Sequence, residues 1–147
     1  MKGILKWPLI VAAVVIVIRI VVERAGAPAS VSNLFSVVAL HTVIVPIYIA
    51  VHLGKSGKPR LYGTLFKLIL AYVLLTRAML LVVYWLARIF RWQEARFSGL
   101  SDSSPLIGFI AIPFATAAFW IVATLVVGGT IGSIILAIMN RRQSATQ

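Results

Sequence analysis

The chain has 147 residues, 61% of them hydrophobic, and carries 14 Lys and Arg against three Asp and Glu, a formal charge of +11. Its mean hydropathy of +1.04 excludes an ordinary soluble domain, in which about half of the residues are apolar, and predicts an integral membrane protein. The sequence contains no cysteine, which excludes disulfides, thiolate metal sites and thiol redox chemistry.

The basic charge points to lipid as a partner. In a soluble protein a charge this high would suggest nucleic acid. Here the basic residues gather at the ends of apolar runs, as they do where they fix topology and meet anionic headgroups. We therefore expect the bilayer and its anionic lipids as partners, and no nucleic acid.

Four apolar runs follow one another along the chain and predict four transmembrane helices, since spans of about 20 residues match a hydrocarbon core of about 30 Å. The runs cover about residues 7–22, 34–53, 63–87 and 106–139. The expected fold class is all-α, a polytopic four-transmembrane-helix bundle that forms a single membrane domain over residues 1–147. Charged and aromatic residues mix over 88–104, which is typical of a segment in the headgroup layer.

The last run is unusually long. As one straight helix its roughly 34 residues would measure about 50 Å, well beyond the hydrocarbon core. Pro113 lies within it and is predicted to kink or divide the helix, because proline lacks the N–H of a regular helical bond.

Orientation follows from the Lys and Arg residues near the spans, which number seven on one side of the predicted bundle and four on the other. The two sets are Lys2, Lys6, Lys55, Lys58, Arg60, Arg141 and Arg142, against Arg24, Arg88, Arg91 and Arg96. The bias predicts that both termini are cytoplasmic, in a bacterial-type inner membrane.

Two arginines fall inside the predicted spans. Arg19 lies four residues before Glu23, so it is expected to pair with this carboxylate and to reach the interface. Arg77 lies about 15 Å from the outer end of its helix, close to mid-membrane. Because the predicted spans offer it no carboxylate, we expect Arg77 either to bind an anion from outside the chain or to donate hydrogen bonds within the bundle.

Polar and aromatic side chains form a stripe on each of two predicted helices. On the third helix, Tyr84 and Arg88 lie within about 20° of Arg77 around the axis. On the second helix, Tyr48 shares a face with His41. If the two helices are antiparallel neighbours, the stripes face each other. The candidate ligand-binding residues are therefore His41, Tyr48, Arg77, Tyr84 and Arg88.

A haem is a further candidate ligand, with His41 as its axial ligand and Arg77 near a propionate. His52 lies about 16 Å from His41 along the helix, so the two cannot bind one iron. The sequence predicts no other metal site.

The last predicted helix carries a regular stripe of polar, aromatic and small residues at four-residue spacing: Thr116, Trp120, Thr124, Gly128 and Gly132. Gly128 and Gly132 form the small-xxx-small pattern that lets two helix backbones approach closely. The pattern leaves open whether the partner helix belongs to this chain or to a neighbouring subunit.

The function is predicted from the residues described above and from the absence of catalytic motifs in the sequence. The chain has no Ser-His-Asp set, H-E-x-x-H, phosphate-binding glycine loop or paired carboxylates, so an enzyme is disfavoured. We expect a non-catalytic small membrane subunit or accessory protein, associated with other membrane subunits or with a second copy, whose outer cationic residues hold an anionic lipid, cofactor or partner. The alternative is a redox or transport component that binds haem, quinone or a small anion between the second and third helices.

Overall fold

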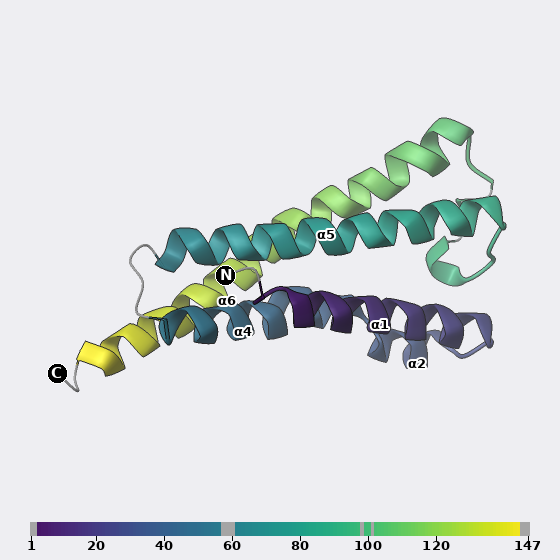
Figure 1. Cartoon of the computed structure of the whole chain (residues 1–147). Coiled ribbons are helices and arrows are strands. Elements are labelled where there is room, and N and C mark those ends of the chain that lie inside the picture. The colour runs from purple at the N-terminus through teal and green to yellow at the C-terminus, as the bar shows by residue number, and fades with distance from the viewer. Residues whose placement is uncertain (1–2, 57–60, 98, 101, 145–147) are drawn as a thin grey trace.

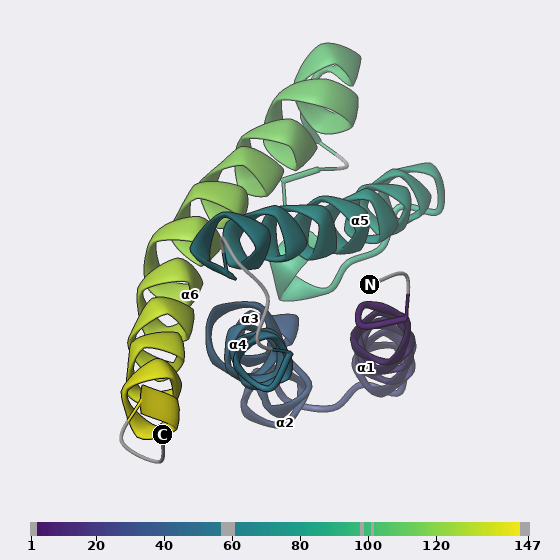
Figure 2. The same cartoon turned by 60° about the vertical axis from the view of Figure 1, so that its left-hand side comes forward.

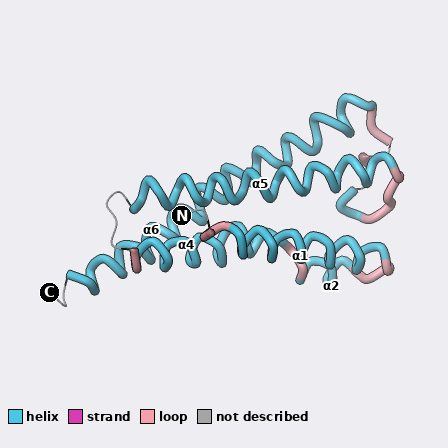
Figure 3. The backbone as a smooth tube through the Cα atoms, in the orientation of Figure 1, coloured by secondary structure: helices cyan, strands magenta, loops and turns pink. Residues whose placement is uncertain are grey.

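The computed structural model describes residues 3–56, 61–97, 99–100 and 102–144, and within these ranges every regular element is helical (Figures 1 and 3). The prediction of an all-α chain is confirmed. Three basic residues used to predict orientation, Lys2, Lys58 and Arg60, lie outside the described residues, as do Ser98 and Ser101 of the predicted interfacial segment.

The elements in chain order are α1 Lys6–Arg24, α2 Ala29–Leu34, α3 Val37–Ala39, the π-helical turn η1 Leu40–Ile44, α4 Val45–Gly54, α5 Leu61–Ile89, the 3-10 turn η2 Ala95–Phe97, the π-helical turn η3 Ile107–Ala111, and α6 Ile112–Ser144. The predicted second span is thus built from several short helical pieces, and the third and fourth are long helices.

Among the described residues, three segments are long and apolar enough to cross a membrane, by length and composition: Ser30–Gly54, Leu61–Ile89 and Ile107–Arg141. The first two contain the second and third predicted spans, and the last contains the fourth except for its first residue, Leu106. The first predicted span forms α1, but this 19-residue helix includes Lys6, Arg19, Glu23 and Arg24 and is not among the three. The charged residues in the last turns of α1 distinguish it from the other long helices.

Both π-helical turns come just before a proline. Pro46 follows η1, and Pro113 follows η3. A proline has no N–H for the carbonyl four residues earlier and its ring crowds that carbonyl, so the wider π turn accommodates it without ending the helix. Pro113 therefore does not divide the last helix, which continues from η3 into α6.

One of the carbonyls freed in this way has a new partner. The residue four positions before Pro113 is Phe109, and its carbonyl accepts a hydrogen bond of 2.9 Å from the indole Nε1 of Trp85 in α5. This side-chain bond replaces the helical bond that Pro113 cannot make. It also ties the beginning of the last helix to α5.

The segment after α5 turns back toward the end of α1 (Figure 1). The chain leaves α5 at a turn where Arg91 has a φ of 50°, and η2 then carries Arg96 to within 3.0 Å of Glu23 in α1. We call this end of the bundle, where α1 and α5 finish, the η2 end.

Helix α6 packs along both α5 and α4. It crosses the bundle obliquely, so that its C-terminal half lies beside α4 while its N-terminal half diverges from α1 and α2 (Figures 1 and 2). The separation between the α5–α6 pair and the α1–α2 pair therefore increases toward the η2 end.

Gly128 and Gly132 face the chain's own helices. A Cβ at Gly128 would lie 2.7 Å from Pro46 Cγ and 3.3 Å from the His41 carbonyl oxygen, and a Cβ at Gly132 would lie 3.1 Å from a methyl group of Leu65. Glycine at these positions lets α6 approach η1, α4 and α5 at close range.

The buried side chains form two apolar clusters. The first contains Ala12, Val45, Ile49, Ala50, Leu53, Leu65, Ile69, Tyr72 and Leu136, and the second, toward the η2 end, contains Ile16, Val37, Leu80, Val83, Ala87, Phe97 and Leu100. On α5, Thr76 and Arg77 fall between the two clusters, and both are buried, as are His41 and Thr124. A polar layer thus crosses the interior at the level of Arg77.

Candidate functional site

The centre of the polar layer is a hydrogen bond between α5 and η1. The guanidinium of Arg77, whose residue is only 6% exposed, lies with Nη2 3.1 Å from Nδ1 of the fully buried His41. A guanidinium can only donate, so Nδ1 accepts and the proton of the neutral imidazole is on Nε2. His41 therefore satisfies one donor of Arg77 without supplying a negative charge.

Arg77 also lies against an aromatic ring. Its Cζ lies 5.4 Å from the ring centroid of Trp120 in α6, within cation–π range. Its buried Nε has no hydrogen-bond acceptor among the described residues. Because a buried charge is costly unless it is paired, Arg77 has an unmet requirement for an anion or an acceptor.

Arg77 lies on the wall of a cavity of about 280 Å³, which we call the inner cavity. Its polar lining comes from α1, α2, Ser36, α5, η2 and α6, and consists of Arg19, Asn33, Ser36, Arg77, Tyr84, Arg96 and Thr116. The rest of the lining is Ile16, Val37, Val38, Leu80 and Trp120. Of the described residues, no carboxylate lines this cavity.

A second cavity of about 460 Å³, the outer cavity, lies at the η2 end. It shares Arg19, Asn33 and Arg96 with the inner cavity and adds Glu23 and Glu94, together with Gly26, Ala27 and Ser32. The two cavities are therefore neighbours, and the shared side chains form the boundary between them.

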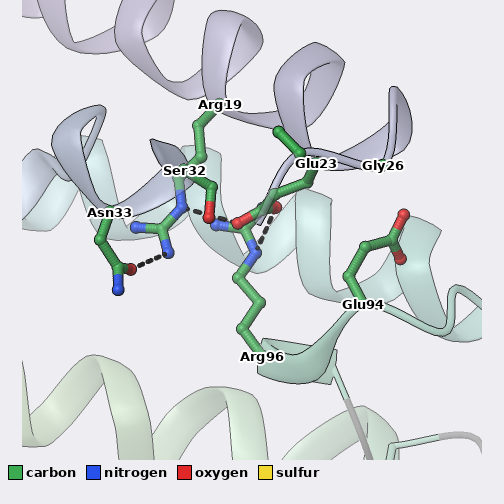
Figure 4. A pocket seen from close by; sticks show the side chains of 8 residues that line it. Arg19, Glu23, Gly26, Ser32, Asn33, Glu94 and Arg96 are labelled. Atoms are coloured by element: carbon green, nitrogen blue, oxygen red, sulfur yellow. Dashed lines mark hydrogen bonds and ion pairs between the residues drawn. The ribbon is translucent and has the colours of Figure 1, made fainter. Parts of the chain in front are cut away.

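The boundary is held by one carboxylate that pairs with two arginines (Figure 4). Glu23 Oε1 lies 2.8 Å from Arg19 Nε, and its Oε2 lies 3.0 Å from Arg96 Nε. Arg19 also donates a 3.2 Å hydrogen bond to Asn33 Oδ1. The predicted pairing of Arg19 with Glu23 is thereby confirmed.

These charges are poorly exposed. The side chains of Arg19, Glu23 and Arg96 are 16%, 9% and 20% exposed, whereas Arg24, which pairs with Glu94 at 3.3 Å, is 55% exposed. Burial lowers the pKa of Arg96, and the nearby Glu23 carboxylate opposes that effect. The Glu23 pairs are thus shielded from water, while the Arg24–Glu94 pair is open to water only on the Arg24 side, since the Glu94 side chain is 14% exposed.

Three of the five sequence-predicted ligand residues come together. Arg77 and Tyr84 both line the inner cavity, and His41 lies behind Arg77. The ring of His41 meets Tyr72 edge-on at 5.4 Å, and His41 is not part of the cavity lining. A haem ligated by His41 would require these neighbours to move.

The other two predicted residues lie elsewhere. Tyr48 packs on His52 with ring centroids 4.2 Å apart and lines a separate apolar depression beside α1. Arg88 donates hydrogen bonds to Ser103 Oγ and to the Ser103 carbonyl, and its Cζ lies 5.0 Å from the Phe109 ring. Arg88 thus fastens the segment before η3 to α5.

Several lining residues were not predicted as ligand-binding residues: Arg19, Asn33, Ser36, Arg96, Thr116 and Trp120. A signal existed for the last two, because Thr116 and Trp120 belong to the four-residue stripe of the last helix. No comparable signal exists for Asn33, Ser36 or Arg96, which lie on or beside the short elements that follow α1 and α5.

Comparisons with known proteins give no relative. No family model matches the chain, and neither a curated protein nor a solved structure matches it. Function is therefore inferred from the cavities and their charges.

Proposed function

We propose that this chain is a small, non-catalytic membrane protein that holds the anionic group of an outside molecule at Arg77. It crosses an inner membrane four times with both termini in the cytoplasm, and it acts as an accessory subunit that presents its bound anion, or depends on it, within a larger membrane complex. The η2 end faces away from the cytoplasm.

The observation that carries this proposal is the state of Arg77. It is 6% exposed, it lies on a cavity, and its nearest hydrogen-bond partner is a neutral imidazole. An intramembrane arginine costs roughly 2.5–3.5 kcal/mol at a helix centre and is retained where it has a function. An anion in the inner cavity would provide the missing negative charge.

Helix α1 is proposed as the fourth span because its charges are placed for an interface. Lys6 begins the helix, while Arg19, Glu23 and Arg24 fall in its last six residues. Between Lys6 and Arg19 the helix is wholly apolar. The Arg19–Glu23 pair reduces the cost of the last turns, and Arg24 extends into the headgroup layer.

Binding of inorganic phosphate to lipid-stripped protein tests the anion proposal. Thermal stability is measured in a neutral detergent while phosphate replaces chloride at constant ionic strength. A ligand that binds only the native state stabilises that state by about 2.7 kcal/mol when its free concentration is 100 times its Kd. We expect phosphate to stabilise the wild-type protein.

Two variants on α5 make the test specific. Arg77→Gln removes the buried charge, and Lys67→Gln removes an exposed charge from the same helix. Phosphate stabilisation should disappear in the first variant and persist in the second. Equal stabilisation of both variants, or none of the wild-type protein, would overturn the proposal.

The redox alternative receives less support. The inner cavity lies beside Arg77 and Tyr84, on the α1 and α6 side, and its lining does not include His41 or Tyr48. The predicted haem or quinone site between the second and third spans included both of these side chains. A colourless protein after gentle purification is the expected result.

A further inference from the structure

We propose that the anion is the phosphate headgroup of a membrane lipid, which enters the inner cavity sideways from the bilayer between α3 and the N-terminal half of α6. This inference rests on the proposed function and specifies its ligand.

The lining of the inner cavity is of two chemical kinds. Arg19, Arg77 and Arg96 provide guanidinium groups, and guanidinium matches phosphate through paired hydrogen bonds. Val37, Val38 and Leu80 provide aliphatic surface. A ligand that satisfies both kinds of lining is amphiphilic.

The charge also fits a phosphate. The three arginines on the inner cavity carry +3, and Glu23, which pairs with two of them, contributes −1, so the local sum is +3 − 1 = +2. A phosphate monoester carries about −1.5 to −2 at neutral pH. It would neutralise this group of side chains more fully than a single carboxylate would.

The inner cavity is large enough for a lipid headgroup but too small for the acyl chains. A volume of about 280 Å³ is near the lower end of small-molecule sites, which measure about 300–1,000 Å³. A phosphate headgroup fits, but two long acyl chains do not. The chains of a bound lipid must therefore remain outside, along the apolar helix surfaces.

The arrangement of the helices provides a lateral route for those chains. Val38 on α3 and Thr116 and Trp120 on α6 line the same cavity, although the N-terminal half of α6 diverges from α2 (Figure 2). Phe119 beside them is 65% exposed. Val38, Trp120 and Phe119 are apolar side chains that suit acyl chains, and we infer that the lipid enters between them.

The experiment compares a lipid with its soluble headgroup. Wild-type protein is reconstituted into nanodiscs of dioleoyl phosphatidylcholine, and binding is measured for dioleoyl phosphatidic acid in the disc and for glycerol phosphate in solution. At equal mole ratios to protein, we expect phosphatidic acid to occupy the site at least about tenfold more strongly than glycerol phosphate. Both should require Arg77.

A blocking variant tests the entry route. Val38→Phe places a ring on the lateral side of the cavity, and Val43→Phe, at an exposed position of η1, is the matched control. Val38→Phe should weaken phosphatidic acid binding at least about tenfold, and by more than it weakens glycerol phosphate binding. Because Val38 lines the cavity, thermal unfolding at the wild-type temperature, rather than retained ligand binding, shows that the variant is folded.

The outcomes separate the two proposals. Glycerol phosphate that binds as strongly as phosphatidic acid, with no effect of Val38→Phe on either ligand, would overturn the lipid inference and leave a soluble anion at Arg77. Arg77-independent binding of both ligands, or no binding of either, would overturn the proposed function itself.

Discussion

Arg77 Nη2 in α5 donates a hydrogen bond of 3.1 Å to His41 Nδ1 in the π-helical turn η1. This bond joins the third predicted span to the second. The bond fixes His41 as a neutral imidazole with its proton on Nε2, because a guanidinium has no acceptor. The pair is therefore a charged donor with a neutral acceptor, and the positive charge of Arg77 remains available to a ligand.

Replacing Arg77 by methionine should separate stability from binding. Exchanging a buried charge for an apolar side chain of similar length is often neutral or stabilising by about 1–4 kcal/mol. We therefore expect the ligand-free Arg77→Met protein to be at least as stable as the wild type in thermal unfolding, and to gain nothing from phosphate. A clear loss of stability in the ligand-free variant would show that Arg77 is a structural residue.

His41→Ala should lower stability. The substitution removes the acceptor of a buried donor, which costs about 1–3 kcal/mol, and it leaves a cavity next to Tyr72. The free energy of unfolding from a denaturant titration in detergent measures this loss. His52→Ala is the control, because His52 is exposed and contacts its own helix; an equal loss in both variants would contradict the structural role of His41.

Replacing Glu23 by glutamine should affect stability more than replacing Glu94 by glutamine. Glu23→Gln leaves Arg19 and Arg96, both poorly exposed, without their shared carboxylate, so the ligand-free protein should lose about 1–3 kcal/mol of stability. Its affinity for phosphate should rise, because a competing anion has been removed. Glu94→Gln affects a pair with an exposed arginine and should change stability by less than about 1 kcal/mol. Unchanged phosphate affinity in Glu23→Gln would contradict this account of the boundary.

Gly128→Ala should disturb the packing of α6 on η1. The new Cβ would lie 2.7 Å from Pro46 Cγ, and overpacking of this kind costs about 1–3 kcal/mol. Gly63→Ala in α5 is the control, since a Cβ there meets open space and alanine favours the helix by up to about 1 kcal/mol. In thermal unfolding, the Tm should fall for Gly128→Ala and rise for Gly63→Ala. Tm shifts of the same sign in both variants would argue against the close approach of α6 to η1.

The four-span topology can be tested with introduced cysteines, because the natural sequence contains none. Gly3→Cys and Lys55→Cys should be labelled by an impermeant maleimide from the cytoplasmic side, and Asp102→Cys from the opposite side. Labelling of Gly3→Cys and Asp102→Cys from the same side would show that α1 does not cross the membrane.

Apolar runs were sufficient to predict the long helices. The runs at 34–53 and 63–87, and all but the first residue of the run at 106–139, fall within the three described segments that are long and apolar enough to span a membrane, because burial in lipid requires continuous apolar sequence. The π-helical turns before Pro46 and Pro113 were not predicted. Periodicity does not show whether a proline kinks a helix or is accommodated by one extra residue in a turn.

The site was predicted only in part, for a physical reason. Arg77 could be recognised from the cost of a charge in an apolar run, and Tyr84 from its position on the same helical stripe as Arg77. Asn33 and Arg96 lie on α2 and η2, elements of six and three residues that follow α1 and α5, and elements this short leave no recognisable period in the sequence. Tyr48 shares a helical face with His41 in an ideal helix, but η1 intervenes and changes the register between them.

Intact-complex mass spectrometry of the gently purified native protein tests the central claim most directly. The account predicts that the wild-type chain and Lys67→Gln retain a phosphate-bearing ligand in stoichiometric amount and that Arg77→Gln loses it. Retention of the same species at the same occupancy by Arg77→Gln, or a wild-type chain that carries no anionic ligand, would contradict it.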